Sequence, residues 1–271
     1  MTVSPEEFEF LRNLCRDISG LALHPGKEYL IEARLLPVAR EEGLGSVSEL
    51  VSRLRLGDAR LRVTAVEAMA THETYFFRDV HPFEALRTDI IPAVLARNDH
   101  ARLSIWSAAS STGQEAFSIA MLIKEHFPRI KNVTILATDF SAEVLSVASA
   151  GIFTQMEVNR GLPAPLLVKY FERRGRSWQI AESIRSMVTF QQLNLIEPFP
   201  ALPSMDIVFL RNVLTYFDPD LKSSVLRKCA TTLRPGSYLF LGGAETIYGL
   251  DVKCDIVRVG RSVCYQYSAS D

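Results

Sequence analysis

Hydrophobic residues in the first part of the chain recur at helical spacing. The stretch "SPEEFEFLRNLCRDISG" begins with Ser4 as a capping residue and Pro5 at the first helical position, and it stops at Gly20. A second helix is predicted over about 26–42, ending at Gly43, and two more over 46–56 and 58–70. Residues 1–70 are therefore predicted to form an all-helical N-terminal domain.

From Leu103 onward, short apolar runs alternate with helical stretches. The candidate strands are 103–108, 133–139, 188–194, 206–212 and 237–243, followed by a closing pair at 255–260 and 262–268. Apolar runs separated by helices predict a parallel sheet covered on both faces. Gly260 and Arg261 join the last two runs, which predicts a hairpin at one edge. The expected fold is α/β, a doubly wound sheet with an antiparallel strand near its end.

Composition places the chain among ordinary globular proteins, with 48% hydrophobic and 23% charged residues. The net charge of -1 gives no sign of nucleic-acid binding, and no apolar run reaches the roughly 18 residues of a membrane span. The N-terminus lacks an apolar signal core. Cys15, Cys229, Cys254 and Cys264 form no close pair and no zinc pattern. We expect a cytoplasmic protein with reduced thiols, no metal and no membrane insertion.

Polar residues follow the predicted strands at the edge where such sheets bind ligands. They are "SAASSTGQE" at 107–115, Asp139, Asn194 with Leu195, Arg211 with Asn212, and "GGAE" at 242–245. Helix caps and turns would also be polar here. That alternative accounts for the serines and threonines but poorly for the charged and amide side chains, so a binding site is predicted at this edge.

The turn after the first strand excludes two phosphate-binding motifs. Its single Gly113 does not make a dinucleotide fingerprint, and no lysine follows as a P-loop requires. Glu115 would repel a phosphate, whereas S-adenosylmethionine carries a sulfonium, an ammonium and no phosphate. Small side chains from Ala108 to residue 110 would let the backbone approach the methionine part. Glu115 could pair with the ammonium, or merely cap the helix dipole, and Asp139 could accept both ribose hydroxyls.

A second group of candidate residues lies ahead of the sheet, in "ATHETYFFRDVHPFEAL" at 70–86. The aromatics Phe76 and Phe77 are expected to pack at the junction of the two domains. Arg78 has two interpretations: a surface salt bridge, or a partly buried guanidinium beside a ligand that carries a carboxylate.

These motifs together resemble the CheR family, the methyltransferases that esterify glutamates on bacterial chemotaxis receptors. The resemblance rests on "T-x-x-T-x-F-F-R" at 71–78, "W-S-A-A-x-S-T-G-x-E" at 106–115, "A-T-D" at 137–139, "N-L" at 194–195, "R-N-V-L-x-Y-F" at 211–217 and "L-R-P-G-x-Y-L-F-L-G" at 233–242. It implies a helical linker at 71–102 that carries cofactor contacts, and a methyltransferase domain at 103–271 with a small β-subdomain near 152–190. It also implies S-adenosyl-L-methionine as cofactor, S-adenosyl-L-homocysteine as product, and cofactor contacts at Thr74, Arg78, Glu115, Asp139, Asn194, Leu195, Arg211 and Asn212. Ala108 is a further predicted contact because of its small side chain.

Two departures from the family pattern lie near the predicted site. His72 stands where the family usually has Asn, and Gly242-Gly243-Ala244-Glu245 stands where it usually has "G-H-S-E". His72 could still hydrogen-bond the cofactor, although its charge would vary near neutral pH. These departures favour the runner-up function, a non-catalytic sensor or scaffold that binds S-adenosylmethionine or S-adenosylhomocysteine.

Methyl transfer to a carboxylate is an in-line displacement by a group that is already ionised at neutral pH. No general base is required, and catalysis should come from alignment and exclusion of water. Arg78 would orient the substrate carboxylate or the cofactor. Tyr216 would line the methyl-transfer site, or serve only as a core aromatic. A nucleic-acid or small-molecule methyltransferase is disfavoured by the near-neutral charge and by "RNVLTYF", which lacks a Pro-Pro-aromatic run.

The family resemblance implies a monomer whose partner is the helical cytoplasmic domain of a methyl-accepting chemoreceptor. Arg53, Arg55, Arg60 and Arg62 lie close together in the N-terminal domain with a single acid, Asp58. They are either a solvated helix face or an electrostatic guide for an acidic receptor helix. Some family members also bind a receptor tail through a glycine-containing loop of the β-subdomain. The corresponding "RRGRS" at 173–177 is short and predicts a tail-independent enzyme.

Overall fold

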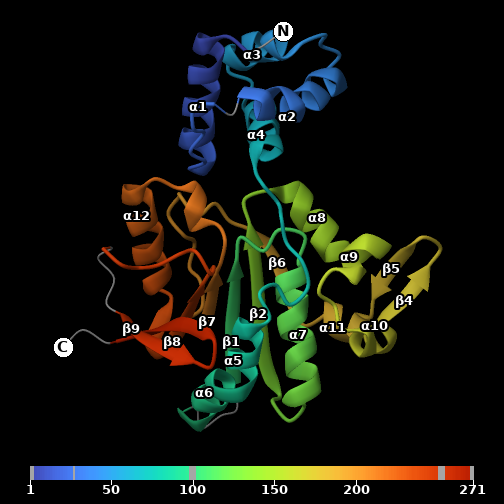
Figure 1. The fold of residues 1–271 in the computed structure, drawn as a ribbon, viewed down its shortest axis with the longest axis vertical. Coiled ribbons are helices and arrows are strands. Elements are labelled where there is room, and N and C mark those ends of the chain that lie inside the picture. The colour runs from blue at the N-terminus through green and yellow to red at the C-terminus, as the bar shows by residue number, and fades with distance from the viewer. Residues whose placement is uncertain (1–2, 27, 98–101, 250–253, 269–271) are drawn as a thin grey trace. The chain divides into compact units, whose positions relative to one another are not determined.

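The computed structural model describes residues 3–26, 28–97, 102–249 and 254–268. The chain divides into two compact units. The helical unit comprises residues 1–71 with 216–221, and the larger unit comprises residues 72–215 with 222–271. Figure 1 shows the fold. Within the described ranges, no helix combines the length and the apolar character needed to cross a membrane.

The helical unit contains the predicted helices, α1 (Pro5–Ser19), α2 (Glu28–Glu41), α3 (Val47–Arg55) and α4 (Ala59–Met69). Ser4 and Glu7 form a capping box at the start of α1, in which each side chain accepts the backbone N–H of the other residue. Gly20 ends α1 in the left-handed region, as the sequence predicts. Asp58 accepts the N–H of Leu61 at the start of α4, 3.0 Å away.

Apolar faces of these four helices form the core of the helical unit. Leu11, Leu35, Leu50 and Leu61 are at most 1% exposed, which is the burial expected for the inward positions of amphipathic helices. The unit also includes the short segment 216–221, and the N–H of Ala22 donates to the carbonyl of Tyr216 over 2.8 Å.

A seven-stranded sheet forms the centre of the larger unit, in the order β6-β2-β1-β7-β8-β10-β9. The strands from β6 to β8 are parallel, whereas β10 runs antiparallel to β8 and to β9. This confirms the doubly wound sheet and the hairpin at its edge. The bounds are β1 (Arg102–Ala108), β2 (Asn132–Asp139), β6 (Val188–Gln192), β7 (Met205–Leu210), β8 (Leu233–Leu241), β9 (Cys254–Val259) and β10 (Ser262–Tyr267).

Helices and turns connect the strands and enclose the core. Every residue of β7 is buried, as expected for a central parallel strand. The Phe209 and Phe240 rings stack with centroids 4.6 Å apart. The helical elements are α5 (His81–Ala85), η1 (Leu86–Ile90), α6 (Ile91–Arg97), α7 (Gln114–His126), α8 (Ala142–Ala150), α9 (Gln155–Asn159), α10 (Ala164–Tyr170), α11 (Glu182–Arg185), η2 (Leu214–Tyr216) and α12 (Pro219–Ala230).

The small β-subdomain implied by the family resemblance is an antiparallel three-stranded sheet. Its strands are β3 (Ile152–Thr154), β4 (Phe171–Arg174) and β5 (Ser177–Ile180), in the order β3-β5-β4. Arg174 pairs with Ser177, so Gly175 and Arg176 alone connect β4 to β5. The expected tight hairpin is therefore present.

Four predicted strand boundaries differ from the structure by two residues or more, and one of them is the end of the predicted strand 237–243, which lies at Leu241. The predicted strands 188–194 and 206–212 end at Gln192 and Leu210. The second ends early because Asn212 has a φ of 58° and donates its N–H to the Glu245 carboxylate, not to a neighbouring strand. β8 begins at Leu233, ahead of the predicted Ser237. Pro235 lies in this early part, where the register between β7 and β8 is irregular and a missing N–H is tolerated.

Candidate active site

The order of the parallel strands locates the expected binding site. β2 and β6 lie on one side of β1, and β7 and β8 on the other. From β1 the chain adds β2 and β6 toward one edge of the sheet, and from β7 it adds β8 toward the other edge. The strand order therefore reverses between β1 and β7. Ligands of doubly wound sheets bind outside the carboxyl ends of the strands at this switch point. The carboxyl ends of β1 and β2, the start of α7 and the turns after β6 and β7 carry most of the predicted cofactor-binding residues.

The turn from β1 to α7 is tightly constrained. Ala109 and Ser111 have φ values of 58° and 50°, and Gly113, at the start of α7, has a φ of 90°. A Cβ at Gly113 would come within 3.1 Å of Ala148 and 3.2 Å of Phe117. Glycine is therefore required here for close packing as well as for its conformation. The hydroxyl of Ser110 is buried and has no hydrogen-bond partner among the described residues, which is a reason to expect a ligand.

Asp139 ends β2 and holds the neighbouring turn in place. Its Oδ2 accepts the N–H of Ser111 over 2.9 Å, and its Oδ1 accepts the N–H of Ser141 over 3.1 Å. The residue is only 7% exposed. Each carboxylate oxygen retains acceptor capacity after these bonds. The arrangement therefore suits the predicted contact with two ribose hydroxyls.

Glu115 and Arg211, predicted as separate cofactor contacts, form a buried ion pair. Nη1 of Arg211 donates to Glu115 over 2.8 Å, and the other Glu115 oxygen accepts the hydroxyl of Ser107 over 2.7 Å. Nη2 of Arg211 donates to the Asp79 carboxylate over 2.6 Å and to the carbonyl of Arg78 over 3.0 Å. We call Arg211, Glu115, Asp79 and the Arg78 carbonyl the Arg211 network. The Nε of Arg211 is buried without a partner in the part of the chain that the structure describes.

The segment 72–80 carries three predicted site residues, His72, Thr74 and Arg78. The carbonyl of His72 accepts the hydroxyl of Ser111 over 3.1 Å, so this segment contacts the β1–α7 turn. Thr74 and Arg78 are half-buried. Phe77, Asp79 and Val80 all have φ values between 51° and 68°, a conformation that costs energy in residues other than glycine. Strain of this kind is often retained at functional sites.

Asn194, Leu195 and Asn212 lie in the turns after β6 and β7. Oδ1 of Asn194 accepts the N–H of Ile196 over 3.2 Å. The carbonyl of Leu195 accepts a hydrogen bond from Lys228, whose ammonium also donates to the carbonyl of Glu197 over 2.8 Å. Partial burial lowers the pKa of the Lys228 ammonium.

Glu245 fixes the turn that carries Asn212. One of its oxygens accepts the N–H groups of Asn212 and Gly242, each over 2.8 Å, and the other accepts the N–H of Thr215 over 3.1 Å. The sequence signal for this role is the acid in "GGAE" after the fifth strand. Gly243 and Ala244 replace the His and Ser that the family usually has at these positions, but the acid that follows them is kept as Glu245.

Two other supporting residues were not predicted from the sequence. The hydroxyl of Ser118, on α7, accepts the N–H of Phe77 over 3.0 Å and so attaches the segment 72–80 to that helix. Asp79 completes the Arg211 network. Asp79 follows Arg78 directly, and its acidic side chain was the available signal. Ser118 carries no recognisable motif.

Tyr216 belongs to the helical unit by its contacts and is half-buried there. Its predicted place at the methyl-transfer site stays a prediction.

The arginine group of the helical unit is engaged in local contacts. Arg53 and Arg60 both pair with Glu42, at 3.5 and 2.7 Å. Nε of Arg62 donates to the carbonyl of Leu54 over 2.8 Å, and the Arg55 guanidinium lies 5.3 Å from the ring centroid of Phe10. Glu42 thus reduces the positive charge of this face. The four side chains remain a cationic group, and their guiding role stays a prediction.

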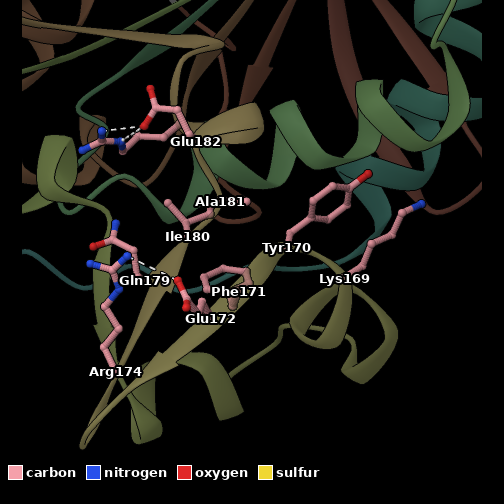
Figure 2. Close-up of a pocket in the computed structure, with 10 residues that line it drawn as sticks. Lys169, Tyr170, Phe171, Glu172, Arg174, Gln179, Ile180, Ala181 and Glu182 are labelled. Atoms are coloured by element: carbon pink, nitrogen blue, oxygen red, sulfur yellow. Dashed lines mark hydrogen bonds and ion pairs between the residues drawn. The ribbon is translucent and has the colours of Figure 1, made fainter.

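A hollow of about 550 Å³ lies elsewhere, along the β-subdomain. Figure 2 shows side chains from α10, β4, β5 and α11 around it. Glu172 pairs with Arg174 at 3.3 Å, and Glu182 with Arg185 at 2.5 Å. The predicted site residues are not among those that line it.

The site at the sheet edge fits S-adenosylmethionine. Buried carboxylates at Asp139 and Glu115 suit ribose hydroxyls and a positive charge. The unpartnered Ser110 hydroxyl and Arg211 Nε are donors that an incoming ligand would satisfy. Groups of three or more metal-ligating side chains are not found among the described residues.

Comparison with known proteins finds relatives that match nearly the whole chain. A family model described as CheR methyltransferase, SAM binding domain, matches residues 72–262, and one described as CheR methyltransferase, all-alpha domain, matches residues 6–70. The "Chemotaxis protein methyltransferase" of Vibrio anguillarum is 39% identical over 98% of this chain and 98% of its own length. "Chemotaxis protein methyltransferase 1" of Pseudomonas aeruginosa is 37% identical over 98% of this chain and 99% of its own, and that of Vibrio cholerae is 38% identical over 98% of each.

Proposed function

Because the chain belongs to the CheR methyltransferase family, we propose that it transfers a methyl group from S-adenosylmethionine to glutamate side chains of bacterial chemoreceptors. The products are glutamyl methyl esters and S-adenosylhomocysteine. The observation that carries the proposal is the likeness to chemotaxis protein methyltransferases over nearly the whole of both chains. None of the comparisons favours the non-catalytic binding alternative.

S-adenosylmethionine is the cofactor, and the carboxyl edge of the sheet offers groups to hold it. We assign the ribose hydroxyls to Asp139 and the positively charged methionine end to Glu115. The small side chain of Ala108, which is 1% exposed, allows close backbone approach. Thr74, Asn194, Leu195 and Asn212 are further proposed contacts, as the family resemblance implies, and His72 is proposed to hydrogen-bond the cofactor where the family usually has Asn. Arg211 contributes by holding Glu115 in position.

The chain's own residues have a limited chemical task. The bound cofactor supplies a methyl group on a positively charged sulfur, and the carbon–sulfur bond breaks as the new carbon–oxygen bond forms. A glutamate carboxylate is ionised at neutral pH and needs no general base. The proposed roles are therefore positional. Arg78 orients the substrate carboxylate or the cofactor, and Tyr216 lines the reaction path. Correct alignment and exclusion of water supply the rate enhancement.

The proposed partner is the helical cytoplasmic domain of a methyl-accepting chemoreceptor, which places the reaction in the cytoplasm. We assign receptor guidance to the domain at 1–70, through Arg53, Arg55, Arg60 and Arg62, and cofactor contacts to the linker at 71–102. The enzyme is proposed to act as a monomer. The domain at 103–271 performs the transfer.

We also propose that the enzyme does not dock on a receptor tail. The two-residue connection between β4 and β5 leaves little backbone to shape a peptide groove. The small sheet does end at β4, so a strand edge is available and the proposal rests on the short turn. Titration with a C-terminal receptor peptide should show no micromolar binding, and receptor lacking its tail should be methylated at the normal rate. Loss of methylation on removing the tail would contradict the proposal.

The test of function is a transfer assay with S-adenosylmethionine labelled in its methyl group and a purified receptor cytoplasmic domain. Glutamyl esters release labelled methanol in mild base, whereas methylated amines keep their label. We expect base-labile label on the receptor, and its loss when the receptor glutamates are replaced by alanine. Tight binding of S-adenosylhomocysteine with no transfer to any receptor would identify a sensor or scaffold instead.

A further inference from the structure

The segment that carries Arg78 rests on the β-subdomain. Phe76 is fully buried, with its ring 5.0 Å from that of Phe153 on β3 and 5.7 Å from that of Phe171 on β4. Gly161, between α9 and α10, has a φ of 82°, and a Cβ there would come 2.0 Å from the carbonyl oxygen of Phe76. The path of the backbone toward Arg78 is therefore set by contacts with the β-subdomain.

One side chain of this region reaches the residues next to Arg78. Nη2 of Arg160, at the end of α9, pairs with the Glu73 carboxylate at 2.5 Å. Its guanidinium carbon lies 4.3 Å from the Tyr75 ring centroid. The Arg78 guanidinium carbon lies 5.6 Å from the same centroid, and its Nη1 donates to the carbonyl of Glu73 over 2.6 Å. Two guanidinium groups thus share one aromatic ring and contact one glutamate residue.

The charges in this group are unevenly matched, with one carboxylate beside two guanidinium groups. The pKa of the Glu73 carboxyl lies below its ordinary value, first because Arg160 donates a hydrogen bond to it and attracts its charge, and then because Arg78 attracts it. Glu73 is ionised and within the electrostatic reach of both arginines. In the structure the Glu73 carboxylate pairs with Arg160, whereas Arg78 contacts Glu73 through its backbone carbonyl.

Loss of Arg160 would leave the Glu73 carboxylate with Arg78 as a neighbouring cation. Guanidinium–carboxylate pairs are favoured by charge and by their matching planar geometry. A pair between Glu73 and Arg78 would compete with any anionic ligand for the same guanidinium. We therefore infer that Arg160 is a positioning residue, which occupies the Glu73 carboxylate and leaves Arg78 available to the substrate or cofactor carboxylate. This inference rests on the proposed function of Arg78.

Rescue by a second substitution tests this role. We expect Arg160→Gln to lower the catalytic efficiency toward receptor, or the affinity for S-adenosylhomocysteine, by about three- to tenfold, the range for exposed guanidinium contacts. Arg160→Lys should retain most of the wild-type value, because an ammonium still pairs with Glu73. The double variant Glu73→Gln/Arg160→Gln should recover the value lost by Arg160→Gln, because no carboxylate then competes for Arg78.

Arg185→Gln is the matched control. Arg185 also lies in the β-subdomain region and pairs with a glutamate at 2.5 Å, but both members of that pair belong to α11. This variant should behave as wild type. A double variant no better than Arg160→Gln, or an equal loss in Arg185→Gln, would overturn the inference, since both are expected of a merely structural arginine. Failure of wild-type enzyme to methylate receptor would instead refute the proposed function. In that case the inference about Arg160 would be tested by S-adenosylhomocysteine affinity, measured for the same set of variants.

Discussion

Replacement of Asp139 by alanine separates the binding role of this carboxylate from its structural role. Its two oxygens each accept one backbone N–H, from Ser111 at 2.9 Å and from Ser141 at 3.1 Å. A carboxylate has roughly four acceptor positions. About two of them therefore remain for the ribose hydroxyls of the cofactor.

The expected loss has two parts. Removal of the ribose contacts should weaken S-adenosylhomocysteine binding by roughly 1–3 kcal/mol, which is the cost of losing a buried charged hydrogen-bond partner. This corresponds to about 5- to 150-fold in the dissociation constant. The N–H groups of Ser111 and Ser141 also lose their acceptor. The free energy of unfolding should fall by about 1–3 kcal/mol for each group that stays unsatisfied.

Asp206→Ala is the control that tests whether lost stability alone weakens binding. Asp206, near the start of β7, is 4% exposed, accepts the N–H of Ser104 over 2.8 Å and pairs with Arg234 at 2.6 Å. It lies toward the amino end of its strand, away from the predicted site. Calorimetric titration and urea unfolding should show reduced stability in both variants but weaker binding only in Asp139→Ala. Unchanged affinity in folded Asp139→Ala, or an equal loss in Asp206→Ala, would refute the assignment.

Three further predictions follow from the described contacts. Arg78→Ala should lower methyl transfer by more than about tenfold with an unchanged circular dichroism spectrum, and Arg78→Lys should not restore transfer, because an ammonium lacks the planar fork of a guanidinium. Near-normal turnover in either variant would mean that Arg78 has only a structural role. Charge reversal at Arg53 and Arg60 should slow receptor methylation, less so at high salt, without altering S-adenosylhomocysteine affinity. The control Glu42→Gln, which removes the shared partner of the two arginines, should not slow methylation, and an equal effect of charge reversal on cofactor affinity would exclude the guiding role. Burial raises the pKa of the Cys254 thiol to about 11, so only about 0.1% is thiolate at pH 8. Alkylation by iodoacetamide should therefore accelerate about tenfold per pH unit up to about pH 10, and rapid labelling at pH 8 would contradict this.

Local sequence patterns predicted much of the fold. The cap at Ser4 and the stop at Gly20 are short-range features that the sequence predicted, and the structure contains both. The apolar runs and the Gly260-Arg261 turn likewise predicted the sheet and its edge hairpin. Strand ends were predicted less well. The end of β7 depends on Glu245, a residue distant in sequence that accepts the Asn212 N–H.

Partners within the site could not be predicted from sequence for the same reason. Asp139 was predicted from its place after a strand, but its bond to the Ser111 N–H depends on how β1 and β2 align. Ser118 lies on α7 without any motif, and its bond to the Phe77 N–H depends on the packing of the segment 72–80 against that helix. Sequence order identifies which residues meet at the sheet edge. It does not identify which of them bond to one another.

The Arg211 network shows why this distinction changes the electrostatic interpretation of the site. A guanidinium that is only 5% exposed is costly to bury and needs close acceptors. Glu115 and Asp79 supply them, so Arg211 is held by two carboxylates that together outweigh its single charge. The network is therefore negative as a whole. Asp139, at the carboxyl end of the neighbouring strand β2, adds a buried carboxylate at the same edge of the sheet. An anionic phosphate would be repelled by this arrangement, whereas a sulfonium and an ammonium would be attracted. Pairing with Arg211 thus positions Glu115 without cancelling the negative charge that a cationic cofactor requires.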